Sequence, residues 1–178
     1  MYKYILIFGY LLLILSCERS VKPTDGFSKG ESQVETAKKV EILYSDSAVV
    51  RIKITSDLLL SHLDKENPFD EFPQGAKLEF FDEQKQPSSV LTSKYAVRYA
   101  QKNVVILRDS CVWQSMSNRE KLESYELIWD ENLKKVYSGK LVIITTPSEK
   151  IWGYGFETNS DFTRWKINKP QGRISINN

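Results

Sequence analysis

The stretch AVVRIKIT, residues 48–55, places an apolar side chain at every even position and, after Val49, a polar side chain at every odd position. Successive side chains of a β-strand point to opposite faces, so this period of two predicts a strand with one buried face. An α-helix would instead repeat its apolar residues every three or four positions. The stretch therefore predicts a strand whose even-numbered side chains face a core.

The same pattern continues on both sides of this stretch, separated by turns rich in Pro, Gly, Asp and Asn. Many short strands with regular turns are typical of all-β folds such as a sandwich, a jelly roll or an open barrel. Strand starts at Leu91, Leu122 and Ile151 lie 31 and 29 residues apart, which is close to a weak internal repeat. The expected strands lie at 40–45, 48–55, 77–81, 91–99, 103–107, 111–113, 122–129, 135–138, 141–146, 151–156 and 163–167, with a last edge at 173–176.

Three irregularities are expected within this series. A kink is predicted at Asp109-Ser110, and a bulge is predicted near Tyr125, where the apolar positions change parity. Residues 56–75 interrupt the strands, with a short helix expected around Leu58–Leu63. This interruption is either a lid over one end of the sheet or a long connection.

The charge and composition exclude several classes of function. The 178 residues carry 25 Lys and Arg against 23 Asp and Glu, a formal net charge of +2. Nucleic-acid binding by bulk charge needs a basic excess or a basic stripe, so no nucleic acid is expected as a partner. His62 is the one histidine, which excludes a metal site with several histidine ligands. We therefore expect no metal and no cofactor.

The first residues are typical of a bacterial lipoprotein signal. A short basic start is followed by the apolar run Ile5–Leu15, which is too short to cross a bilayer as a helix. The run ends in Leu15-Ser16-Cys17, which resembles a lipobox; plain secretion and an uncleaved anchor are the alternatives on the residues alone. This resemblance implies a signal peptide at 1–16, cleavage before Cys17, and a diacylglyceryl group on the Cys17 thiol that anchors the chain in a membrane. Loss of Lys3 lowers the net charge from +2 to +1.

The domain organisation follows from this start. Residues 17–39 are predicted to be the lipidated cysteine and a flexible polar linker, and residues 40–178 are predicted to be one β domain. Cys111 is then the sole cysteine of the folded part and cannot form an intramolecular disulfide. It is interpreted as a small buried apolar residue in a strand.

A set of short motifs occurs in order along the chain. The motifs are Tyr44-Ser45-Asp46-Ser47, Glu71-Phe72-Pro73-x-Gly75, Phe80-Phe81-Asp82, Ser89-x-Leu91-Thr92-x-x-Tyr95-Ala96, Leu122-Glu123-Ser124-x-Glu126-Leu127-x-Trp129-Asp130, Lys135-x-Tyr137-Ser138, Val142-x-Ile144-Thr145-Thr146-Pro147 and Gly153-x-Gly155-Phe156-Glu157. This ordered set resembles the LptC family, the periplasmic component of the lipopolysaccharide export system, in its lipoprotein form, and the resemblance covers about three quarters of the chain. The chain departs from the family pattern at Asp109-Ser110-Cys111, where Gly-Asn-Val is more common, and in its lipobox, because many relatives use an uncleaved transmembrane helix.

The resemblance implies an OstA-like antiparallel β jelly roll, or open β-sandwich, at the periplasmic face of the inner membrane. Such a domain would accept lipopolysaccharide from the inner-membrane ABC transporter and pass the lipid A acyl chains along an apolar groove to the next periplasmic bridge protein. The side chains expected to face this groove are Val50, Ile52, Ile54, Leu78, Phe80, Leu91, Tyr95, Ile106, Trp113, Leu122, Leu127, Trp129, Val142, Ile144 and Phe156.

The resemblance also implies docking by strand addition at both ends of the sheet. The first strands, 40–54, would pair with the transporter, and the last strands, 165–176, would pair with the bridge protein. The residues that mark these docking edges are Val40, Ile42, Tyr44, Trp165, Ile167 and Ile174.

Two other functions are open on the residues alone. An envelope lipoprotein could bind glycans through exposed aromatic side chains, with Trp113, Trp129, Trp152 and Trp165 as a stacking platform. The two hypotheses differ in the face that these tryptophans occupy, outside for glycans and inside for lipid. Catalysis is not expected, because neither a nucleophile motif nor a zinc motif surrounds His62.

Overall fold

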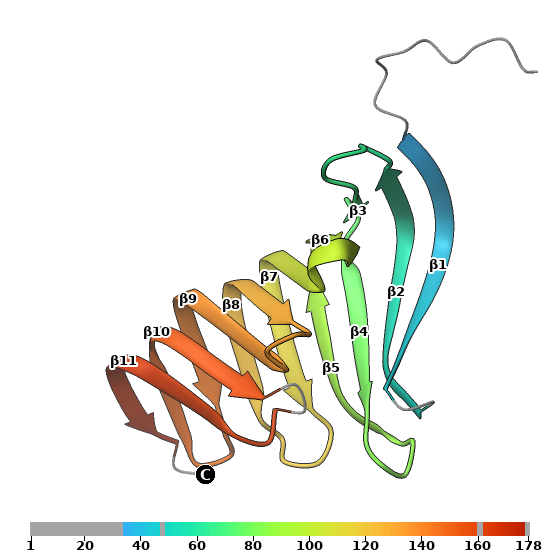
Figure 1. The fold of residues 1–178 in the computed structure, drawn as a ribbon. Helices are drawn as coiled ribbons and strands as arrows, with labels where there is room; N and C mark the ends of the chain where they lie inside the picture. The colour runs from blue at the N-terminus through green and yellow to red at the C-terminus, as the bar shows by residue number, and fades with distance from the viewer. Residues whose placement is uncertain (1–33, 47–48, 160–161, 177–178) are drawn as a thin grey trace, which may run out of the picture. The chain divides into compact units, whose positions relative to one another are not determined.

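The computed structural model describes residues 34–46, 49–159 and 162–176, which belong to one compact unit, Ser32–Asn178. These residues form eleven strands in one antiparallel sheet and a single turn of 3-10 helix, η1 (Ala100–Lys102), as Figure 1 shows. The prediction of an all-β antiparallel fold is therefore confirmed. The signal peptide, Cys17 and most of the linker lie outside the described residues. The strands are β1 (Val34–Asp46), β2 (Val49–His62), β3 (Phe69–Phe72), β4 (Ala76–Phe81), β5 (Pro87–Ser93), β6 (Tyr95–Tyr99), β7 (Val104–Ser115), β8 (Lys121–Asp130), β9 (Lys135–Thr145), β10 (Glu149–Asn159) and β11 (Trp165–Ser175).

The sheet divides into two arms between β2 and β7. The first half of β2 pairs with β4, and β4 pairs with β5, which reaches the second half of β7. The second half of β2 pairs with β3, and β3 pairs with β6, which reaches the first half of β7. Strands β8 to β11 follow β7 one after another, and β1 pairs with β2. Each long strand therefore contributes one half to each of two layers.

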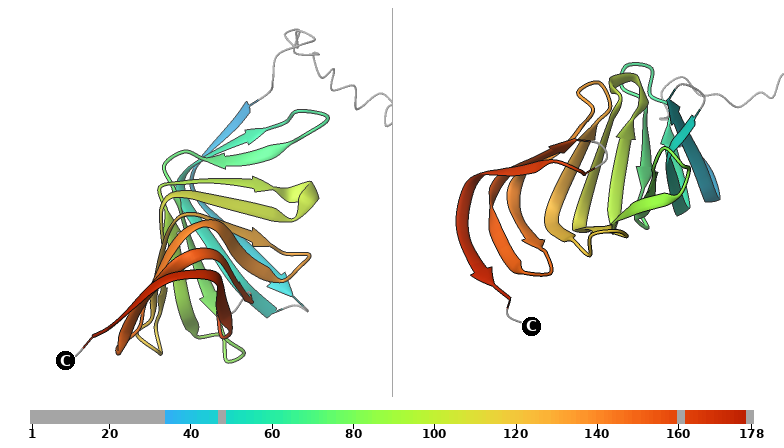
Figure 2. Two further views of the ribbon diagram at one scale, coloured as in Figure 1. Left: turned by 90° about the vertical axis from the view of Figure 1, so that its left-hand side faces the viewer. Right: turned by 90° about the horizontal axis from the view of Figure 1, so that it is seen from below.

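A row of bulges marks the boundary between the two halves. In β7 the register shifts between Arg108 and Cys111, and both intervening residues, Asp109 and Ser110, have a positive φ near 60°. In β8 the register shifts across Tyr125. The predicted kink and the predicted bulge are thus confirmed. A bulge bends its strand, and Figure 2 shows the two halves of the sheet diverging as two layers.

Gly155 provides the corresponding irregularity in β10. Its φ is +72°, a conformation that costs little for glycine, and the pairing of β10 with β9 shifts register at this point. The bend therefore continues across β7, β8 and β10.

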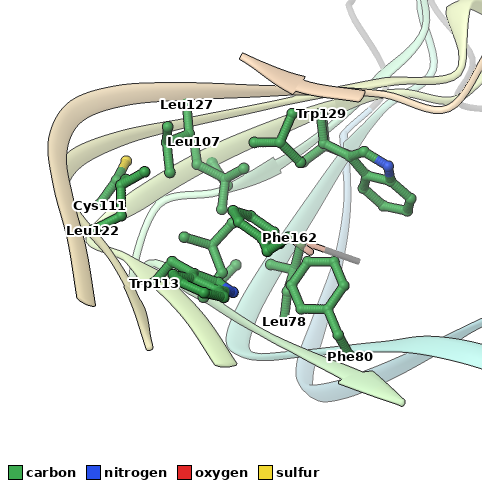
Figure 3. Close-up of a cluster of buried hydrophobic side chains, with 14 of the residues drawn as sticks. Leu78, Phe80, Leu107, Cys111, Trp113, Leu122, Leu127, Trp129 and Phe162 are labelled. Carbon is green, nitrogen blue, oxygen red and sulfur yellow. The ribbon is translucent and has the colours of Figure 1, made fainter. Parts of the chain in front are cut away.

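The hydrophobic core lies between the two layers. Figure 3 shows Leu107, Leu127 and Trp129 on one wall and Leu78, Phe80 and Trp113 on the other. Side chains alternate along each strand, so every layer directs one set of side chains inward and the other set outward. The inward set is mainly apolar. The fully buried members include Phe72, Leu78, Leu91, Val105, Leu107, Leu122, Leu127, Val136, Val142 and Phe156.

The helix predicted around Leu58–Leu63 is wrong, and so is the start of the domain at residue 40. Strand β2 continues to His62, and β1 begins at Val34, six residues earlier than predicted. The two errors have one cause, because residues 34–38 pair with 58–62. A polar strand at the sheet edge and a Leu-rich strand beside it carry little periodicity of their own, so the long-range pairing decides the conformation.

The interruption between β2 and β4 contains β3 and a tight turn. Gly75 closes this turn with φ at +87°, and its N–H donates to the carbonyl of Phe72 at 3.1 Å. A Cβ at this position would lie 2.3 Å from the backbone oxygen of Ser93, so the turn requires glycine. Strand β3 pairs with β2 and β6 and is therefore part of one arm of the sheet.

Candidate functional site

The interior between the two layers contains most of the side chains predicted to face a groove. All but three of the fifteen are buried, and the exceptions are Val50, Tyr95 and Ile106. Val50 is half-buried at the start of β2 and shares the parity of Ile52. The other twelve side chains are buried between the two layers, and their contact with lipid stays a prediction.

Ile106 and Tyr95 lie on the opposite face, which corrects two of the assignments. In β7 the buried neighbours of Ile106 are Val105 and Leu107, so the inward parity is odd rather than even. The run from Val104 to Leu107 is apolar at every position, and its parity cannot be read from the sequence. Tyr95 is half-buried, and its hydroxyl donates to Glu71 Oε1 at 3.0 Å outside the core.

Several interior residues were missed by the sequence analysis. Val136 lies near the start of β9, where only a short strand at 135–138 was expected, and Phe72 lies in the stretch taken as an interruption. Both follow the period of two once their strands are recognised. Phe162 follows no period, because it belongs to the connection between β10 and β11. The missed interior residues are Phe72, Ala76, Ala96, Val105, Leu107, Val136 and Phe162.

The interior opens at one end into a cavity of about 730 Å³. This volume lies within the range of about 300–1,000 Å³ that ligand pockets occupy. Apolar side chains form its inner part, and two cationic and three acidic side chains belong to its rim. The lining residues are Tyr44, Arg51, Ile52, Phe80, Phe81, Asp82, Glu83, Ser88, Trp129, Glu131, Lys134, Asn159 and Thr163.

Phe162 fills the interior beside this cavity. Its ring stacks on Trp113 with centroids 4.5 Å apart and meets Phe80 edge-on at 5.5 Å. Only 4% of Phe162 is exposed, and its φ is +58°, an uncommon conformation for a bulky residue. Its N–H donates to the carbonyl of Asn159 at 3.0 Å. Aromatic packing therefore holds a loop residue in the space between the two layers, as Figure 3 shows.

The four tryptophans do not form a platform on the outer surface. Trp113 and Trp129 are 4% and 2% exposed and face the interior, and Trp165 packs against the core. Trp129 also meets Tyr44 edge-on at 5.3 Å. Trp152 is half-buried and alternates with the buried Gly153, so it lies on the other face of β10. Two of the four rings are therefore buried in the interior, and a third packs against it.

His62 lies away from the interior, in a small polar cluster at the end of β2. Its Nε2 is 2.9 Å from Glu71 Oε2, and its ring stacks on Phe69 at 4.1 Å. Tyr95 donates to the same Glu71, and burial, followed by this hydrogen bond, raises the pKa of Tyr95 above its ordinary value.

Within residues 34–46, 49–159 and 162–176, no three His, Cys, Asp or Glu side chains gather in a way that could hold a metal ion.

Cys111 is buried beside the bulge of β8, as the sequence analysis interpreted it. Its Sγ lies 3.6 Å from the carbonyl of Tyr125, and burial raises the pKa of its thiol to about 12. The neutral thiol is therefore the form that the fold accommodates.

A stability measurement at high pH tests this placement of Cys111. Above about pH 9 the unfolded chain loses the thiol proton while the folded chain keeps it, so stability falls as pH rises towards 12, by at most ~1.4 kcal/mol per pH unit. Urea unfolding measures this loss. Between roughly pH 9 and 10.5 the free energy of unfolding of the parent chain should fall by about 2 kcal/mol more than that of Cys111→Ala. Tyrosines titrate in both proteins, so their contribution cancels in this comparison. An equal loss of stability in the two proteins would mean that the Cys111 thiol is exposed to solvent.

The two outer strands of the sheet are β1 and β11. In the described structure β1 pairs only with β2, and β11 pairs only with β10. The predicted first docking region, 40–54, included β2, which is paired on both sides and is not an edge. The predicted edge residues Val40, Ile42, Tyr44, Trp165 and Ile167 are half-buried and pack against the core, whereas Ile174 is 58% exposed.

Among the described residues, no helix has the length and apolar character needed to cross a membrane. Comparison of the chain with models of protein families and with curated proteins finds no match.

Proposed function

We propose that this chain is a carrier of lipopolysaccharide acyl chains in the bacterial envelope and adopts the open jelly roll of the LptC family. The observation that carries the proposal is the interior, which is apolar on both walls and open at one end through a cavity of about 730 Å³. The ordered sequence motifs support the proposed family, and the apolar interior supports the proposed ligand.

An apolar interior removes the main obstacle to lipid transfer through water. Exposure of one CH₂ group to water costs about 0.8 kcal/mol, so a chain of about a dozen carbons costs roughly 10 kcal/mol. Burial between Trp129 and Phe80 at the mouth, and between the leucines behind them, would offset this cost. Transfer between such domains then needs no exposure of the chain to solvent.

The two sheet edges fit docking by strand addition. An exposed edge presents unpaired N–H and C=O groups and normally has to be protected from pairing with other chains. In the proposal β1 pairs with the inner-membrane ABC transporter, and β11 pairs with the next periplasmic bridge protein. The contact is head to tail, so successive domains extend the groove.

The proposed location is the periplasmic face of the inner membrane. The lipobox at Cys17 carries this part of the proposal, with the acylated thiol as the anchor and the residues before the sheet as the tether. Energy for transport comes from the transporter, and this chain acts as a passive conduit that binds no cofactor.

Glycan binding by exposed aromatics is the weaker proposal. Stacking on a sugar needs aromatic faces that are open to solvent. Trp113 and Trp129 turn their rings to the interior, and Trp165 packs against the core. The positions of these rings favour lipid over glycan.

Affinity purification from membranes tests the proposed assembly. The tagged full-length chain should co-purify with the ATPase subunit of the lipopolysaccharide transporter after mild detergent extraction. Cys17→Ser is the matched control for the anchor and should reduce the membrane-bound fraction of the chain. Recovery of the anchored chain without the transporter would contradict the assignment.

A further inference from the structure

Four buried polar side-chain atoms have no hydrogen-bond partner among the described residues. One of them, Ser93 Oγ, belongs to a residue that lines a separate pocket beside Gly75. The other three are the indole Nε1 of Trp113, the indole Nε1 of Trp129 and the hydroxyl Oγ of Ser89. Buried indole N–H groups usually find an acceptor, because a buried donor left without one destabilises the fold. Orphaned donors in an otherwise apolar space therefore need an explanation.

The three groups lie on facing walls of the same space. Ser89 pairs in register with Phe80 on one side and with Ser115 on the other. Trp113 lies two residues before Ser115, on the same face of β7. Trp129 lies on the opposite wall and lines the cavity together with Phe80 and Tyr44. Figure 3 shows Trp129 on one wall and Trp113 on the other, with Phe162 between them. A ligand that enters from the mouth therefore passes Trp129 first.

The rim of the cavity limits the kind of head group that fits. Arg51 and Lys134 are cationic, whereas Asp82, Glu83 and Glu131 are acidic, so the rim has no cationic excess. A strongly anionic group would gain little there. The acceptor that best matches a neutral, largely apolar environment is a carbonyl oxygen at the start of a hydrocarbon chain.

We propose that the cavity binds acyl esters, with the ester carbonyl accepting a hydrogen bond from Trp129 Nε1 while the hydrocarbon chain extends between the two layers. The inference rests on the proposed function, because it names the chemistry that the lipid presents to this interior. Trp129 then selects an acyl chain over a plain alkyl chain, and Trp113 and Ser89 offer polar contacts to oxygen atoms farther inside.

Two probes with the same chain length test this selection. The probes are 1-dodecanoylglycerol, which has an ester carbonyl, and 1-O-dodecylglycerol, which has an ether oxygen in its place. One net hydrogen bond is worth about 0.5–1.5 kcal/mol, so the ester should bind roughly two- to tenfold more tightly. In Trp129→Phe, which keeps an aromatic ring and loses the N–H, this preference should disappear. Trp152→Phe on the other face is the matched control and should keep the preference.

An NMR spectrum of the tryptophan indole N–H groups in the unsubstituted full-length chain tests the same proposal. This measurement does not depend on whether a variant folds. With ¹⁵N-tryptophan, the ester should move the Nε1–H signal of Trp129 downfield, and the ether should not. Equal affinity for both probes, or a Trp129 N–H already hydrogen-bonded without a probe, would overturn the inference and leave the apolar carrier intact. Failure of both probes to bind would overturn the carrier itself and the inference with it.

Discussion

Replacing Phe162 with alanine is expected to lower the free energy of unfolding by about 3 kcal/mol and to raise the affinity for a dodecanoyl probe about tenfold. The first effect follows because the ring is buried and its removal leaves a cavity. The second follows because the ring occupies space between the layers and has to leave before an acyl chain extends past Trp113. Aromatic pairs are worth about 0.5–1.5 kcal/mol beyond their buried area, and this energy no longer opposes binding.

Phe72→Ala is the matched control for this prediction. Phe72 is fully buried in β3 and does not line the cavity at the mouth. Its truncation should destabilise the fold by a similar amount without a gain in affinity. Urea unfolding and a fluorescent acyl-chain displacement assay measure the two quantities. A Phe162→Ala variant that loses stability and gains no affinity would show that Phe162 is only a core residue.

Replacing Ser175 with proline is expected to reduce binding of the downstream bridge protein at least tenfold. Ile176 N–H donates to the carbonyl of Ser148 on the β10 side at 2.8 Å. Because neighbouring residues of an antiparallel strand alternate in direction, the N–H of Ser175 points to the free edge. Proline removes this donor and places its ring in the path of an added strand.

Ser175→Ala keeps the N–H and is the matched control. Both variants should retain the fold, because Ser175 lies at the exposed end of the outermost strand. The measurement is quantitative pull-down of the bridge protein with each variant, with the transporter at the other edge as an internal reference. Unchanged pull-down by the proline variant would contradict docking at β11.

The regular strands and the bend between layers could be predicted from local sequence. Alternation in residues 48–55 and the shift of parity near Tyr125 are local signals, and both correspond to features of the sheet. Strand β1 from Val34 and the second half of β2 could not be predicted. Each segment becomes a strand by pairing with the other, which lies twenty or more residues away in the sequence, and neither segment alternates clearly.

The candidate site was predictable only in part, for the same reason. A strand with apolar residues at both parities, such as Val104–Leu107, does not reveal which face is inside until its neighbours are placed. Phe162 reaches the interior from a loop, and no periodic pattern marks such a residue. The orphaned indole N–H groups emerge only when the surroundings of Trp113 and Trp129 are complete.

Photo-crosslinking in living cells tests the central claim most directly. A photoreactive residue at Trp129, at the mouth of the interior, is predicted to capture lipopolysaccharide through its acyl chains. The same residue at Trp152, on the other face of β10, is predicted to capture little or none. Capture of polysaccharide without lipid, or stronger capture at Trp152 than at Trp129, would contradict a lipid-carrying interior.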